Sequence, residues 1–75
     1  MSAVVLYRID TAKHMRRYYR MDVQLDLFGA WCLMREWGRI GRAGQVRSVP
    51  YSTPHEAEAA LQRQSRAKQW RGYLT

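Results

Sequence analysis

The sequence has one cysteine and two histidines, so the residues that most often bind transition metals are nearly missing. A single thiol, Cys32, excludes an intramolecular disulfide and a cysteine cluster of the kind that holds zinc. His14 and His55 stand in polar, turn-like surroundings without a plausible set of metal ligands beside them. We therefore expect no metal site and no cofactor.

Long hydrophobic runs are also missing. No apolar stretch approaches the roughly 20 residues that a membrane-spanning helix needs. The apolar start, residues 1–6, meets charged and polar residues within two positions, so it is too short for a signal peptide. We expect a cytoplasmic protein without membrane contact.

Acidic residues are scarce. Six of them face thirteen basic residues, which gives a formal net charge of +7, and eleven of the thirteen are arginine. Arginine carries a planar fork of donors that matches phosphate oxygens and stacks on rings. A solvated basic surface that serves solubility is one interpretation of this charge. The other is a polyanionic partner, with nucleic acid favoured over membrane because no helix has a bulky apolar face.

At 75 residues the chain has room for one domain, residues 1–75. Three alternating segments predict strands at residues 3–9, 16–25 and 31–37, and a fourth strand is expected at residues 45–51. The second segment alternates most clearly, with its apolar side formed by Tyr19, Met21, Val23 and Leu25. Glycines at positions 41 and 44 predict a hairpin turn after the third strand.

The connection between the second and third strands carries Leu27 and Phe28. We expect these two side chains to pack over a sheet edge; recruitment of a partner is the alternative.

The end of the sequence predicts one helix. Thr53 can cap it, Pro54 suits its first position and Glu56 completes a capping box. A narrow stripe of small residues should face the sheet: Ala57, Ala60, Leu61, Gln64 and Ala67. The helix should end near Trp70, after which Tyr73 and Leu74 return to the sheet. The fold class is α+β: a four- to five-stranded antiparallel sheet with one long C-terminal helix packed across one face.

Catalytic patterns are not recognisable. The sequence shows no Ser-His-acid arrangement, no paired carboxylates, and glycines that open onto a strand rather than a helix. We expect no enzyme and no small-molecule substrate.

The third strand ends at Trp37-Gly38-Arg39-Ile40-Gly41, and Trp31-x-Leu33-x-Arg35 precedes it. With Tyr18-Tyr19-x-Met21 before it, Gln45 after the turn and Lys68-x-x-Arg71-Gly72-Tyr73 at the end, this pattern resembles the WGR domain over residues 16–74. The resemblance implies a module that holds DNA ends in poly(ADP-ribose) polymerases and occurs in bacterial proteins of less certain role. It implies that Trp37 and Arg39 contact DNA near a 5′ end, and that Lys68 lies near the nucleic-acid surface.

Three groups of residues are therefore candidates for a DNA-binding site. The first is the end of the third strand, the second is the end of the helix, and the third is the start of the second strand. The end of the third strand contributes Trp37, Gly38, Arg39 and Arg42. The end of the helix contributes Lys68, Arg71 and Tyr73. The start of the second strand contributes Arg16 and Arg17, with Arg20 nearby.

The sequence leaves two alternatives for the site. Trp37 is either exposed for stacking or buried in the core, whereas Trp31 is the mainly structural tryptophan. DNA-binding relatives often have an asparagine just before the paired tyrosines, where this chain has Arg16-Arg17. Arginine there would add a charge-assisted phosphate contact or indicate a different ligand geometry.

We expect binding to double-stranded DNA ends or nicks through stacking and phosphate contacts, with little base specificity. RNA is the other nucleic acid considered as a ligand. The alternative is a protein–protein interaction adaptor without specific DNA binding.

Overall fold

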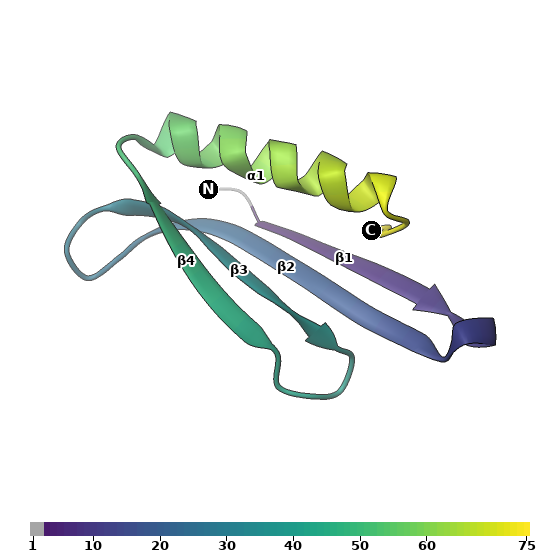
Figure 1. Cartoon of the computed structure of the whole chain (residues 1–75). Coiled ribbons are helices and arrows are strands. Elements are labelled where there is room, and N and C mark those ends of the chain that lie inside the picture. The colour runs from purple at the N-terminus through teal and green to yellow at the C-terminus, as the bar shows by residue number, and fades with distance from the viewer. Residues whose placement is uncertain (1–2) are drawn as a thin grey trace.

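The computed structural model describes residues 3–75, which form a four-stranded antiparallel sheet and one long helix. The strand order is β1-β2-β3-β4, and α1 lies across one face of the sheet (Figure 1). The α+β class predicted from the sequence is confirmed, with four strands. The elements are β1 (Ala3–Asp10), the short 3-10 helix η1 (Thr11–Lys13), β2 (Met15–Leu25), β3 (Trp31–Arg39), β4 (Gln45–Tyr51) and α1 (Pro54–Trp70).

The central pair of strands is the longest in the sheet. The β2–β3 pairing runs from Leu25 opposite Trp31 to Arg17 opposite Arg39, and the Ile40 N–H extends it by donating to the Arg16 carbonyl at 2.9 Å. The alternation of β3 is confirmed, because Cys32 and Glu36 face away from α1 whereas Leu33 lies in the core. β3 continues through Gly38 to Arg39, two residues beyond the predicted end.

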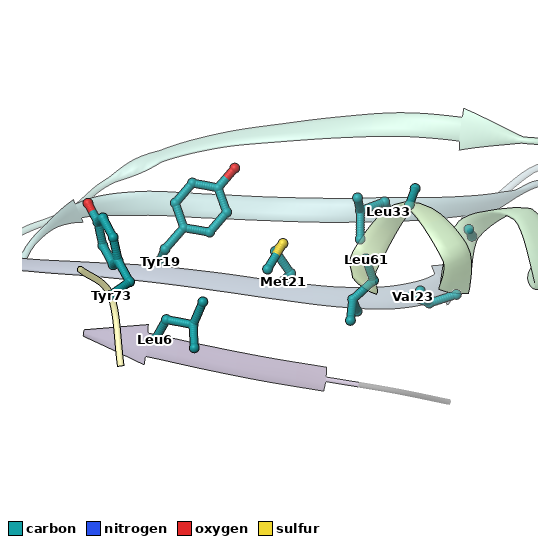
Figure 2. Close-up of a cluster of buried hydrophobic side chains, with 9 residues drawn as sticks. Leu6, Tyr19, Met21, Val23, Leu33, Leu61 and Tyr73 are labelled. Atoms are coloured by element: carbon teal, nitrogen blue, oxygen red, sulfur yellow. The ribbon is translucent and has the colours of Figure 1, made fainter. Parts of the chain in front are cut away.

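The core occupies the sheet face that α1 covers. Figure 2 shows Tyr19 and Tyr73 at one end of this row of side chains and Val23, Leu33 and Leu61 at the other. The opposite face, here called the open face, carries no helix and leaves several apolar side chains in solvent: Val5, Tyr7, Ile9 and Val46. The two faces of one thin sheet therefore meet different environments.

The start of α1 agrees with the sequence. The Glu56 N–H donates to Thr53 Oγ1 at 3.1 Å, and the Glu56 carboxylate accepts from the Ser52 N–H at 3.2 Å. The first bond satisfies a donor of the first turn, as a capping box requires, whereas the second goes to the residue before the cap rather than to the Thr53 N–H, so only the Thr53 half of the predicted capping box forms.

The predicted helix stripe is wrong at one position. Ala67 is exposed, whereas Ser65 is buried and Lys68 is partly buried. At 3.6 residues per turn, position 68 rather than 67 follows Ala57, Leu61 and Ser65 on the inner side of α1, and the Lys68 side chain lies over the Tyr19 ring.

The packing expected for Leu27 and Phe28 is also wrong. Their side chains are 100% and 95% exposed. Asp26 Oδ1 accepts from the N–H groups of Phe28 and Ala30, at 2.8 and 2.9 Å, and this closes a tight turn in which Gly29 has a φ of 79°. Because the turn lies past the last β2–β3 pair, no sheet lies under these side chains.

The chain end returns to the sheet as predicted. Tyr7 and Leu74 exchange two backbone hydrogen bonds of 2.7 Å, which cover the outer edge of β1 at that point. Gly72, with a φ of 95°, makes the turn after α1. No helix formed by the described residues is both long and apolar enough to cross a membrane.

Candidate nucleic-acid interface

Trp37 is neither sealed in the core nor free in solvent. It lies on the α1 side of β3, is half-buried and packs against the core cluster. Its cross-strand neighbour is Tyr19, and the two rings lie 5.9 Å apart between centroids with an interplanar angle of 17°. This is the offset arrangement that aromatic pairs favour. The tyrosine holds the indole in place, and the exposed remainder of the indole is available to a ligand.

Lys68 reaches the same place from α1. Its Nζ lies 4.4 Å from the centroid of the Tyr19 ring and 5.5 Å from that of Tyr73. Burial lowers the pKa of Lys68 below its usual value, and the positive charges of Arg71, Arg35 and Arg17 lower it further. The ammonium group is thus partly stripped of water and repelled by its neighbours, a state that an anion would relieve.

These residues surround a depression of about 460 Å³ between the end of β3, the start of β2 and the end of α1. We call it the cationic depression. It brings together seven residues that the sequence nominated: Arg16, Arg17, Trp37, Gly38, Arg39, Lys68 and Tyr73.

Among the described residues no acidic side chain lines the cationic depression, and none of its arginines is paired with a carboxylate. Arg39 donates from Nη1 to the His14 carbonyl at 3.4 Å, which ties it across the end of the sheet. Positive charge therefore gathers around the indole without local neutralisation.

Two nominated residues lie outside the depression. Arg42 lines a groove on the open face, together with Tyr7 and Tyr18, so it does not join Trp37 and Arg39. Arg71 follows α1 and acts on the site only through its charge on Lys68. Arg20 also points to the open face, where its guanidinium lies 3.8 Å from the Asp22 carboxylate.

Tyr73 lines the depression but belongs mainly to the core. It is 7% exposed and meets Tyr19 edge-on, with 6.3 Å between the ring centroids and 75° between the planes.

Gly38 has a structural reason to be glycine. A Cβ at this position would lie 2.9 Å from the Gly44 Cα, and a Cβ at Gly44 would overlap the Trp37 carbonyl and the Tyr18 hydroxyl. The β3–β4 hairpin therefore closes by direct backbone contact beside Trp37. From the open face, the Tyr18 hydroxyl supports this contact by donating to Glu36 Oε2 at 2.6 Å, a bond that raises the pKa of Tyr18.

Sequence reasoning missed Tyr19 and Arg35 as parts of the site. Tyr19 was assigned to the core, and it is buried, but its ring also supports Trp37 and carries Lys68. Arg35 donates from Nη1 to the Tyr19 hydroxyl at 3.4 Å. Tyr19 lies on the predicted apolar side of its strand, and Arg35 shares a side of β3 with Trp37, but their contact follows only from the cross-strand register.

A half-buried aromatic ring surrounded by unopposed cations, on a small sheet-and-helix scaffold, defines a binding module for a polyanion. In agreement with this, residues 2–75 match the model of the WGR domain, and the chain belongs to that family. The WGR domain is a nucleic-acid-binding module and not a catalytic domain.

A curated relative is 39% identical over 66 residues and is described as "Uncharacterized protein y4dW" of Sinorhizobium fredii (strain NBRC 101917 / NGR234). The alignment covers 88% of this chain and 32% of that protein, so the chain spans about a third of the relative's length. No solved structure matches the chain.

Proposed function

We propose that this WGR domain binds double-stranded DNA at ends or nicks, through one stacking contact and a set of phosphate contacts. The observation that supports this best is the partly exposed Trp37 side chain in a depression lined by Arg16, Arg17, Arg39 and Lys68. Within residues 3–75 no carboxylate lines the depression and competes with phosphate for these cations.

The residues divide the work by chemistry. The indole of Trp37 stacks on a terminal base or sugar, a contact of about 1–3 kcal/mol by analogy with single-strand platforms. The guanidinium groups of Arg39, Arg16 and Arg17 each donate to two oxygens of one phosphate, and Lys68 binds phosphate as a point charge.

The shape of the site supports the proposed preference for an end. A base inside a closed duplex has neighbours on both of its faces, so a ring in a depression can reach only a terminal or interrupted stack. No element of the described chain projects as a helix or ribbon that would enter the major groove, so little base reading is expected.

The test is a fluorescence anisotropy titration over a range of salt concentrations. The ligands are a blunt 5′-phosphorylated duplex, closed-circular DNA as competitor, single-stranded DNA and double-stranded RNA. Contacts with about four to six phosphates predict a slope of log K against log salt of about −4 to −5. Equal affinity for ended and closed DNA would refute end recognition, and tighter binding to RNA would replace DNA as the ligand.

A second candidate function, a protein-interaction adaptor, is favoured by the open face. A groove of about 530 Å³ lies there, lined by apolar side chains such as Val5, Tyr7 and Ile40 together with Arg20 and Arg42. An adaptor predicts a stoichiometric protein complex that survives high salt, is lost in Tyr7→Ser and is unaffected by Trp37→Ala. A complex with the opposite response to these two variants would exclude the open face as its contact surface.

A further inference from the structure

A second group of arginines lies on the same face of the sheet, beyond Trp37. Arg35 and Arg47 are directly paired across β3 and β4, and Arg63 faces them from α1. With Gln64 they line a groove of about 240 Å³, here called the arginine groove. None of these three arginines belongs to the cationic depression.

The arginine groove is electrostatically unfavourable as it stands. Like charges directly opposite on neighbouring strands destabilise a sheet. No acidic residue lines the groove, and within residues 3–75 none of its three arginines forms a salt bridge. A core contact would not need three guanidinium groups in this arrangement.

Arg35 shows a second sign of an unmet partner. Its Nε is shielded from solvent and has no hydrogen-bond acceptor among the described residues. Such a group costs free energy in the unbound protein. The half-buried side chain is also held by its bond to the Tyr19 hydroxyl, so the guanidinium is fixed in position rather than mobile in solvent.

Arg35 connects the two sites. It lies two residues from Trp37 on the same side of β3, a step of about 7 Å along the strand. Its charge acts on Lys68 in the cationic depression, and its own groove opens toward Arg47 and Arg63. The turn that joins β3 to β4 lies away from α1 in Figure 1, whereas Ala60, Arg63 and Gln64 of α1 line the arginine groove itself.

We propose that the arginine groove is a second phosphate-binding site for the same nucleic-acid strand whose end lies on Trp37. This inference rests on the proposed function and adds to it the direction that the strand takes: from the cationic depression past Arg35 toward β4 and α1. The three guanidinium groups bind backbone phosphates, which neutralises the repulsion between Arg35 and Arg47.

The test compares exposed arginines that differ only in where they lie. Arg63 and Arg66 are both exposed on α1, but only Arg63 lines the arginine groove. The variants are R63Q, R47Q/R63Q and the control R66Q, each titrated with a blunt 5′-phosphorylated duplex across a salt series. Each lost phosphate contact should reduce the slope by about 0.9. We expect a reduction of about 1 for R63Q, about 2 for R47Q/R63Q and no change for R66Q.

A melting curve at low salt provides the independent readout. R47Q/R63Q removes the positive charges that face Arg35, so its melting temperature should be unchanged or higher while its affinity falls. If the salt slopes of R47Q/R63Q and R66Q both equal the wild-type slope while Trp37→Ala still weakens binding, the arginine groove is not a phosphate site. The proposed function would then stand without it. Wild-type protein that binds no nucleic acid would overturn the proposed function itself, and the inference with it.

Discussion

At the residue scale, the site depends on side chains that have both a structural and a ligand-facing part. Trp37 packs against the core through one part of its ring and lines the cationic depression with another. Lys68 lies over Tyr19 yet keeps its charge toward the same depression. Such residues are costly to replace for two separate reasons, so each test needs a variant that separates stability from binding.

Trp37→Ala should weaken binding to DNA ends by about tenfold or more, because the stacking contact is lost. It should also lower the free energy of unfolding by about 2 kcal/mol, since the indole is only half-buried and a fully buried tryptophan loses about 3–5. Trp37→Phe keeps the contact with Tyr19 and should recover most of the stability. The control is Trp70→Ala, which removes a tryptophan that is 91% exposed and should change neither quantity.

Lys68 gives a pH prediction. Its pKa is lowered in the free protein by burial and by neighbouring positive charges, so the charged form is disfavoured in the folded state. The unfolded chain holds this proton to higher pH than the folded chain does. Folding stability should therefore rise with pH through the interval between the lowered pKa and the ordinary value of about 10.4.

A bound phosphate reverses this shift. It stabilises the ammonium form, so the pKa of Lys68 should rise on DNA binding, and affinity should fall as pH increases through the pKa of the free protein. An NMR titration that follows the Lys68 Cε–Nζ resonances, with and without DNA, measures both values. A pKa that does not move on binding would place the phosphate elsewhere.

At the scale of elements, the strands and the helix were predictable because their periodicities are strong. The alternation of β2 and the capping sequence of α1 each determine a local structure without help from the rest of the chain. The register between strands is not local. Tyr19 and Trp37 meet because β2 and β3 pair in one particular register, and that register could not be read from either strand alone.

Gly44→Ala should therefore damage the site through the hairpin. The added methyl overlaps the Trp37 carbonyl and the Tyr18 hydroxyl, and relief of this overlap should cost about 1–3 kcal/mol of stability. Thermal unfolding and anisotropy should both report the loss, because Trp37 has to move. The control is Gly29→Ala, whose Cβ meets no neighbour within 4 Å although its φ is 79°. It should cost about 1–2 kcal/mol through backbone strain and leave DNA binding unchanged.

Thr53→Ala tests the capping of α1 separately from the site. Loss of the bond from the Glu56 N–H to Thr53 Oγ1 should lower the free energy of unfolding by about 1 kcal/mol. In a domain of this size that corresponds to about 4–8 °C in Tm. Thr53→Ser keeps the hydroxyl and should melt near the wild-type temperature. A loss of DNA affinity equal to that of Trp37→Ala would show that the start of α1 contributes to binding.

At the scale of the whole molecule, the sheet separates two kinds of surface. The α1 side carries the cationic depression and the arginine groove, whereas the open face carries exposed apolar side chains and the Arg20–Asp22 ion pair. Composition predicted the partner class, because a charge of +7 dominated by arginine suits phosphate. Composition could not predict that the cationic sites lie on the α1 side of the sheet and the exposed apolar side chains on the open face.

Arg42 shows why proximity in the sequence does not predict the face on which a side chain lies. It lies three residues after Arg39 in the sequence, yet the hairpin turn carries it to the opposite face. The exposure of Leu27 and Phe28 has the same origin, since both depend on where a turn leaves the sheet.

The central claim is that nucleic acid binds in the cationic depression, with its end on Trp37. The most direct measurement is a two-dimensional ¹H–¹⁵N NMR titration of the protein with a short 5′-phosphorylated blunt duplex. We expect the largest shifts at the Trp37 indole N–H, the Gly38 and Arg39 amides and the residues around Arg16, with little change at the Trp70 indole. Shifts confined to the open face, with an unmoved Trp37 indole, would contradict this claim.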